Sequence, residues 1–244
     1  MINDLLLLSG NDIPFPEAQL VIHNPSIKEI GLIGEEAFFN GCAVLNFSKE
    51  NLSNEDRFNL RDLSEIEILM MMMDNNHPEM RKNRVNAFLV LTLLFPNYQL
   101  STTKNSIVLK KDEQDFFINT ENFLNFKEKL VHMFCLKGRG DDTTSYNPSG
   151  KYAQEIAEQF AKRRQILAER QGEQKITVLN RYASILATGL RLDLNSVLQY
   201  TVFQLYDQFD RYELFEQADF YIRAKMAGAS GMKEPDNWKK DIHS

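Results

Sequence analysis

Residues 137–150 divide the chain into two regions of different composition. This stretch holds three glycines, one proline and almost no apolar side chain, which is typical of a linker or a long exposed loop. Mixed helix and strand patterns precede it, and only helical patterns follow it. We therefore predict an α+β domain over residues 1–136, the linker or loop over residues 137–150, and an all-helical domain over residues 151–244.

Short strands and capped helices alternate in the first region. We expect a strand at residues 5–8, closed by a polar turn, and a second strand at residues 19–23. Ser26 and Glu29 fit a capping box, in which each side chain satisfies a free amide at the start of a helix. Apolar side chains then recur at three- and four-residue intervals, so this helix is predicted to run to Asn40, where a glycine follows.

Two further helices and a small sheet are predicted next. The helices cover residues 59–74 and 78–95. The methionines at 70–73 are either part of the core, which we favour, or an adaptable contact surface. Thr120 is expected to cap the helix that follows the sheet. Three short β-rich runs separated by polar turns predict an antiparallel meander over residues 98–102, 106–110 and 115–119.

Every pattern beyond the linker is helical. We predict helices over residues 151–171 and 176–188, then a long helix that Asp193 or Asn195 caps. The fold class is therefore α+β, with an N-terminal α/β domain that holds a small antiparallel sheet and a C-terminal all-α helical bundle.

The residue pattern contains no recognisable catalytic, cofactor or metal motif. The four histidines lie far apart and show none of the spacings that hold zinc. Cys42 and Cys135 lie in separate segments, and we interpret them as small apolar side chains rather than nucleophiles. Gly31 and Gly34 fall within a predicted helix and lack the lysine of a phosphate-binding loop. We therefore predict a protein that is not an enzyme and that holds no cofactor and no metal.

The charge pattern disfavours nucleic acid as the main partner. The net charge is −6 and the pI is about 5.4, whereas proteins that bind nucleic acid usually carry a positively charged surface. The basic run at residues 162–164 has glutamates three or four positions away on the same predicted helix, as a solvated face does. No stretch reaches the roughly 20 apolar residues that span a bilayer, so no membrane association is expected.

Aromatic residues recur along the last predicted helix and widen its apolar stripe. The charges between them are mostly acidic, which disfavours stacking on nucleic-acid bases. The stripe is either the core of a helical bundle or a groove that binds another protein. The predicted protein-binding residues come from this stripe and from one aromatic position in the tail: Phe203, Tyr206, Phe209, Tyr212, Phe215 and Trp238.

Several stretches resemble proteins of tailed phages. Residues 13–16, 22–30, 33–39 and 121–123 resemble small tail-assembly proteins of phages of Firmicutes and related bacteria. The C-terminal part resembles a phage-encoded helical module often carried beside them, at residues 198–209, 224–228 and 237–243. The resemblance covers most of the chain in patches. Many of these proteins are shorter and end near the position of the linker.

The resemblance implies a chaperone for phage tail assembly. Such a protein holds the tape-measure or tube protein soluble while the tail is built, so the expected partners are phage tail proteins, with a homo-oligomer also open. The expected location is the cytoplasm of the bacterial host, or the virion. Two alternatives stay open: a permanent structural virion protein of the tail, neck or baseplate, and a small phage-encoded host-interaction or nucleic-acid-binding factor.

Overall fold

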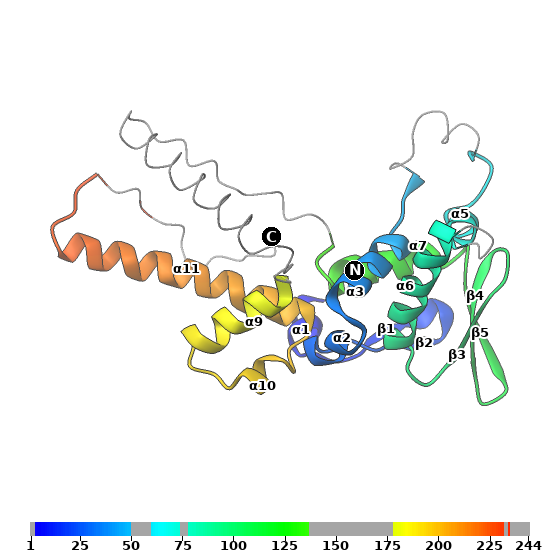
Figure 1. Ribbon diagram of the computed structural model, residues 1–244, viewed down its shortest axis with the longest axis horizontal. Coiled ribbons are helices and arrows are strands. Elements are labelled where there is room, and N and C mark those ends of the chain that lie inside the picture. Colours follow the sequence, from blue (N-terminus) through cyan, green and yellow to red (C-terminus); the bar gives the residue numbers. More distant parts are fainter. Residues whose placement is uncertain (1–2, 50–59, 74–77, 137–177, 232–233, 235–244) are drawn as a thin grey trace.

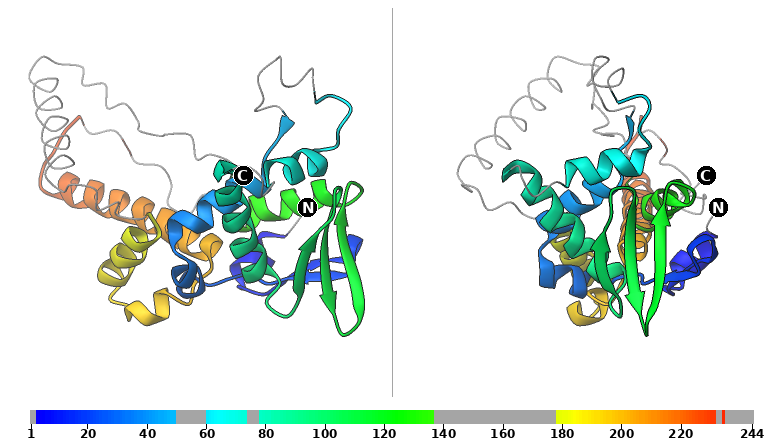
Figure 2. Two further views of the ribbon diagram at one scale, coloured as in Figure 1. Left: turned by 45° about the vertical axis from the view of Figure 1, so that its right-hand side comes forward. Right: turned by 90° about the vertical axis from the view of Figure 1, so that its right-hand side faces the viewer.

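The computed structural model describes residues 3–49, 60–73, 78–136, 178–231 and 234, and Figures 1 and 2 show their arrangement. The N-terminal half holds two small antiparallel sheets with helices around them, and the C-terminal region is helical, which confirms the predicted fold class. The predicted linker and the predicted helix over 151–171 lie outside the described residues. The predicted domain boundaries therefore stay a prediction.

The chain begins with a short helix, so the strand predicted at residues 5–8 is wrong. α1 (Asp4–Leu8) is capped by Asn3, whose side chain accepts a hydrogen bond from the Leu5 amide at 2.9 Å. A short run of leucines fits either period, and the cap favours the helix. Leu7 is fully buried, whereas Leu5 is exposed, so only one side of this helix joins the core.

The second predicted strand is confirmed as part of a two-stranded sheet. β1 (Ile13–Phe15) pairs antiparallel with β2 (Leu20–Ile22), and the 3-10 turn η1 (Pro16–Ala18) joins them. In both strands the outer two residues are buried and the middle residue is exposed. The sheet therefore presents one apolar face to the core.

The predicted capping box is present, but the helix that it starts is interrupted. Glu29 accepts hydrogen bonds from the amide and the hydroxyl of Ser26 at 2.8 and 2.7 Å. Gly34 has a φ of +87°, a conformation that glycine adopts at low cost, and it separates two helices. These helices are α2 (Ile27–Ile33) and α3 (Glu35–Leu45).

The sequence suggested that a helix ends at Gly41. In the structure Gly41 lies inside α3. A Cβ atom at this position would come within 2.3 Å of the Asn86 carbonyl oxygen in α6 (Pro78–Leu94). The glycine therefore allows α3 to pack closely on α6.

Another capping box, between Ser64 and Glu67, starts α5 (Glu65–Met72), which is shorter than predicted. Met73 is buried and Met71 exposed, so part of the methionine block joins the core.

The predicted meander is confirmed. Its strand order is β3-β4-β5, both pairs are antiparallel, and the strands are β3 (Gln99–Thr102), β4 (Ser106–Lys111) and β5 (Gln114–Asn119). Figure 2 shows this sheet at the end of the molecule opposite α9 and α11.

The helix after the meander starts later than predicted. In α7 (Phe123–Met133) the N-cap residue is Asn122, not Thr120. The Asn122 side chain accepts a hydrogen bond from the Asn119 amide at 2.8 Å, which ties the helix start to the end of β5. Phe126 of α7 then fills the core between β1 and α6, with ring centroids 6.0 Å from Phe15 and 6.2 Å from Phe95.

The described C-terminal residues form one medium, one short and one long helix. They are α9 (Val178–Gly189), α10 (Leu194–Val197) and α11 (Val202–Met226). The prediction that Asp193 or Asn195 caps the long helix is wrong, because Asp193 caps the short α10. Thr201 caps α11 and forms a capping box with Gln204. Figure 1 shows α11 running from the middle of the molecule past α9 to its far end.

The described C-terminal helices pack directly on the N-terminal half. The amides of Ile27 and Lys28 donate to the carbonyl oxygens of Tyr200 and Leu198, both at 2.8 Å. The Glu35 carboxylate of α3 accepts from the amide of Leu179 in the first turn of α9, at 3.2 Å to each oxygen. Buried side chains of both regions belong to one hydrophobic cluster. Within the described residues, no helix has the length and apolar character needed to cross a membrane.

Candidate protein-binding surface

The first half of α11 buries two of the predicted protein-binding residues. Phe203 and Phe209 are only 5% and 6% exposed. The Phe209 ring stacks on Tyr182 of α9 with 3.8 Å between ring centroids and 6° between ring planes. Tyr206 meets the same Tyr182 ring edge-on at 5.6 Å. In this structure Phe203 and Phe209 are therefore core residues, and a protein-binding role for them stays a prediction.

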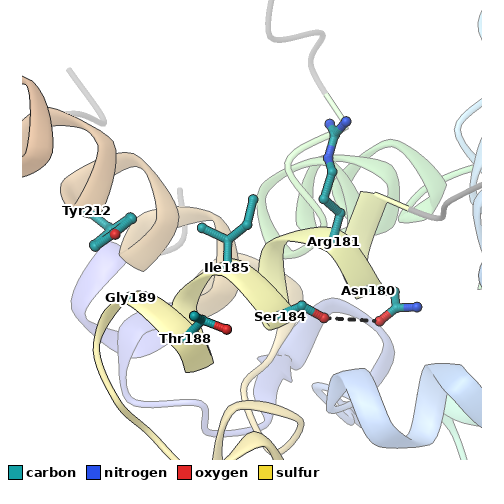
Figure 3. Close-up of a pocket in the computed structure, with 7 residues that line it drawn as sticks. All are labelled: Asn180, Arg181, Ser184, Ile185, Thr188, Gly189 and Tyr212. Carbon is teal, nitrogen blue, oxygen red and sulfur yellow. Dashed lines mark hydrogen bonds between the residues drawn. The ribbon is translucent and has the colours of Figure 1, made fainter. Parts of the chain in front are cut away.

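Tyr212 marks the end of the contact between α9 and α11. A Cβ atom added at Gly189 would lie 2.4 Å from the Tyr212 hydroxyl oxygen, so the two helices touch where glycine leaves room. A shallow groove of about 520 Å³ runs along this contact. Figure 3 shows its lining, with Arg181 and Ile185 on one side of α9 and Asn180 and Ser184 on the other.

The Tyr212 hydroxyl faces Glu216 one turn further along α11. Burial raises the pKa of Tyr212 above its ordinary value. The negative charge of Glu216 and the hydrogen bond between the two side chains raise this pKa further. Tyr212 is therefore protonated near neutral pH and donates a hydrogen bond to Glu216.

The second half of α11 carries a separate apolar face, which we call the distal face. It consists of Leu214, Ala218, Ile222 and Met226, which follow one another at four-residue intervals and therefore lie on one side of the helix. Ile222 is 56% exposed and Met226 is 85% exposed, and Leu214 and Ala218 are half-buried. Phe215, one of the predicted binding residues, lies beside this face and is 49% exposed.

The distal face points away from the side of α11 that enters the core. Successive residues of a helix turn by about 100°, which places Ile222 roughly 140° around the axis from Phe209. On the side of Phe209, the second half of the helix carries Glu213, Glu216 and Phe220, and all three are exposed. The core stripe therefore ends near Tyr212, and a new stripe begins on the other side.

Ionic side chains flank both stripes. Asp207 is buried and pairs with Arg211 at 3.2 Å, and Asp219 pairs with Arg223 at 2.7 Å. Both are pairs of residues four apart on one helix, of the kind that stabilises helices modestly.

Two elements of the sequence-based hypothesis cannot be placed. Trp238 lies outside the described residues, and so does the basic run at 162–164. Of the predicted binding residues, the structure brings Tyr206 and Phe209 together around Tyr182 and leaves Phe215 apart from them. Sequence patterning did not separate these two groups, because all of them recur at helical intervals.

The cysteines lie at sites of different burial. Cys42 is fully buried, and burial raises the pKa of its thiol far above the usual range. Cys135 is half-buried. The sequence-based interpretation of Cys42 as a small apolar side chain agrees with its place in the core.

His23 connects two acidic side chains at the start of α2. Its ring nitrogens lie 2.8 Å from an Asp12 oxygen and 3.1 Å from a Glu29 oxygen. Burial raises the pKa of Glu29, but hydrogen bonds from Ser26 and His23 outweigh this effect and leave the pKa below its ordinary value. No group of three or more potential metal ligands occurs among the described residues.

A polar pocket of about 490 Å³, which sequence patterning did not indicate, lies where the N-terminal half meets the start of α11. Its lining includes Asn24, Lys28, Gln199 and Gln204. Among the described residues, nothing donates a hydrogen bond to the buried Asn24 side-chain oxygen. The residues come from segments almost two hundred positions apart, so no local pattern could have predicted this pocket.

Comparison with known protein families gives a match in the C-terminal region. The model of a family described as the YomV second domain matches residues 172–243. The matched residues make up less than a third of the chain and include α9, α10 and α11. The match connects this region of the chain with a phage-associated domain. Searches of curated proteins and of solved structures gave no match.

Proposed function

We propose that this is a non-enzymatic phage morphogenesis protein that binds another phage structural protein through the distal face of α11, in the manner of a tail-assembly chaperone. The proposed partners are tail proteins such as the tape-measure or tube protein. The proposed site of action is the cytoplasm of the bacterial host, before the tail is complete.

The exposure of the distal face carries this proposal. Burying a large aliphatic side chain stabilises a contact by about 1.5–3 kcal/mol, and Ile222 and Met226 are both more than half exposed. Leu214 and Ala218 extend the same row by two further turns. A row with four-residue spacing fits the way in which one amphipathic helix packs against another.

The family match supports the phage context of the proposal. The matched region contains the whole of α11 and therefore the whole distal face. The sequence resemblance to tail-assembly proteins supports the narrower assignment as a chaperone.

Co-purification tests the proposal directly. The chain is co-expressed with tail structural proteins of a related phage, and the retained proteins are identified. Ile222→Glu should abolish retention, because it places a charge in the centre of the distal face. The matched control Gln217→Glu introduces the same side chain at an exposed position on the other side of the helix and should retain the partner. Equal retention by both folded variants would contradict the proposal.

The alternative functions predict different results. A permanent virion protein of the tail, neck or baseplate should appear in purified particles, whereas a chaperone should be absent from them. A nucleic-acid-binding factor should be held by immobilised DNA or RNA at low salt and released at high salt, through residues 162–164.

A further inference from the structure

We propose that the polar pocket at the start of α11 binds a carboxylate that carries a hydrogen-bond donor beside it. The carboxyl end of a polypeptide and a small acylated amino acid or hydroxy acid share this chemistry. The site goes beyond the proposed function, because the pocket lies at the start of α11 and the distal face lies at its end.

Three separate segments of the chain form the pocket and hold one another in place. The Gln204 side chain donates to the Leu8 carbonyl oxygen at 2.8 Å and accepts from the Thr201 amide at 2.9 Å. A Cβ atom at Gly10 would lie 2.9 Å from the Gln204 side-chain nitrogen, so glycine lets the chain pass close to α11. The volume of about 490 Å³ falls within the range of roughly 300–1,000 Å³ that is usual for small-molecule sites.

Asn24 lines this pocket and supplies an acceptor that lacks a donor. The residue is only 4% exposed. Its amide donates to an Asp12 oxygen at 3.1 Å, and its side-chain nitrogen donates to the Asn11 carbonyl oxygen at 3.5 Å. These bonds fix the side chain, whose oxygen receives no hydrogen bond from the residues that the structure describes. A buried acceptor without a donor is unfavourable, so the pocket favours a ligand that brings an N–H or O–H group.

Lys28 and Gln199 supply donors to the same pocket. Both residues line it, and both are exposed. Within the described part of the chain, no carboxylate pairs with the Lys28 ammonium and no group bonds to the Gln199 side chain. A carboxylate that enters the pocket can therefore accept a charge-assisted hydrogen bond from Lys28 and a second bond from Gln199.

The charges around the pocket favour an anion. The 25-residue helix α11 begins there, so the positive end of its helix dipole lies at the pocket. Glu29 also lines the pocket, but its carboxylate already accepts from the amide and the hydroxyl of Ser26 and lies 3.1 Å from a ring nitrogen of His23. These neighbours offset the charge of Glu29, and Lys28 stays available to a ligand.

Leu32 gives the pocket one apolar edge. It is 83% exposed and lies one turn after Lys28 on α2, so the two side chains lie on the same side of this helix. An apolar side chain beside the carboxylate would cover Leu32. N-acetylleucine combines the three features: a carboxylate for Lys28, an amide N–H for Asn24 and an aliphatic side chain for Leu32.

Titration of the full chain with N-acetylleucine tests the proposal. Calorimetry should detect binding, and the NMR signals of amides in residues 24–32 and 199–204 should shift. Lys28→Gln should weaken binding at least about tenfold, because it removes the charged donor. The matched control Lys82→Gln removes an exposed lysine of α6 and should leave binding unchanged. Absence of binding at millimolar concentration, or equal binding by the folded Lys28→Gln variant, would overturn the proposal.

Two matched pairs of ligands test the separate contacts. N-acetylleucinamide lacks only the carboxylate charge of N-acetylleucine and should not bind. 2-Hydroxy-4-methylpentanoate differs from 4-methylpentanoate only by a hydroxyl beside the carboxylate, and it should bind about three- to tenfold more tightly because this hydroxyl can donate to Asn24. Equal binding within either pair would contradict the proposed chemistry.

A hexapeptide that ends in leucine distinguishes the two sources of such a carboxylate. Tighter binding of the hexapeptide than of N-acetylleucine would identify the end of a polypeptide as the ligand, and equal or weaker binding would identify a small free acid. Ile222→Glu should not affect either ligand, since the distal face is a separate site. Failure of this pocket to bind therefore leaves the proposed function standing, and loss of co-purification leaves the pocket standing.

Discussion

The rings of Tyr182 in α9 and Phe209 in α11 lie stacked, with 3.8 Å between their centroids and 6° between their planes. This contact holds the two helices together where α11 leaves the body of the protein, and Phe209 is almost fully buried. It defines the boundary between the part of α11 that belongs to the core and the part that projects from it.

Removal of the Phe209 ring should destabilise the protein. Phe209→Ala should lower the free energy of unfolding by about 3–5 kcal/mol, because it removes a buried aromatic side chain and leaves a cavity. Urea denaturation followed by circular dichroism measures this change. Phe220→Ala on the same helix should have an effect close to zero, since Phe220 is 66% exposed. Equal effects of the two substitutions would contradict the burial of Phe209.

A larger residue at Gly189 should lower the stability of the protein as long as Tyr212 lies against this position. Gly189→Ala should destabilise the protein by about 1–3 kcal/mol through overpacking, although alanine by itself favours helix over glycine. A double-mutant cycle with Tyr212→Leu measures the coupling, and the smaller partner should reduce the cost of the alanine. Additive effects in this cycle would mean that the two residues do not meet.

The Glu29 carboxyl should make stability depend on pH in the acidic range. Its pKa is lower in the folded protein than in the unfolded chain, so it stabilises the fold at a pH above its ordinary value of 4.5. This contribution is lost as the pH falls through the folded pKa. Glu29→Gln should therefore reduce stability at pH 7 and flatten the decline between pH 5 and lower values, as thermal unfolding across pH would show. Glu128→Gln, at an exposed position of α7, provides the control.

The link between Glu35 and the first turn of α9 should hold the C-terminal helices on the N-terminal half. Glu35→Ala leaves the Leu179 amide without this acceptor and should cost about 1 kcal/mol, the usual effect of losing a helix cap. Hydrogen exchange should detect faster exchange of the Leu179 amide, with no change at amides in the β3–β5 sheet. An unchanged rate at Leu179 would show that the contact does not protect this helix end.

Several parts of the fold could be predicted because their causes are local. The capping box of Ser26 and Glu29 needs only residues three apart, and it is present as predicted. The three strands of the meander alternate with polar turns and lie close to the predicted ranges. The helical character of the C-terminal region follows from apolar side chains at three- and four-residue intervals.

Other parts depended on contacts that are distant in the sequence. The local sequence predicts that a helix ends at Gly41. In the structure the backbone of α6 lies so close to Gly41 that only glycine fits there, inside a helix. Asp193 and Thr201 are both good caps, and the contact of residues 198–200 with α2 accompanies the start of the long helix at the second one. Local propensity offers such alternatives, and tertiary contacts select among them.

The sequence by itself determined that this chain is an α+β protein with a long aromatic helix near its end, because periodicity and capping act over a few residues. Only the tertiary structure decided which aromatic residues that helix buries. Phe209 enters the core because Tyr182 of α9 covers it, while Ile222 and Met226 lie beyond the end of α9 and stay exposed. A helical interval places residues on a side of a helix, but what lies against that side depends on the rest of the fold.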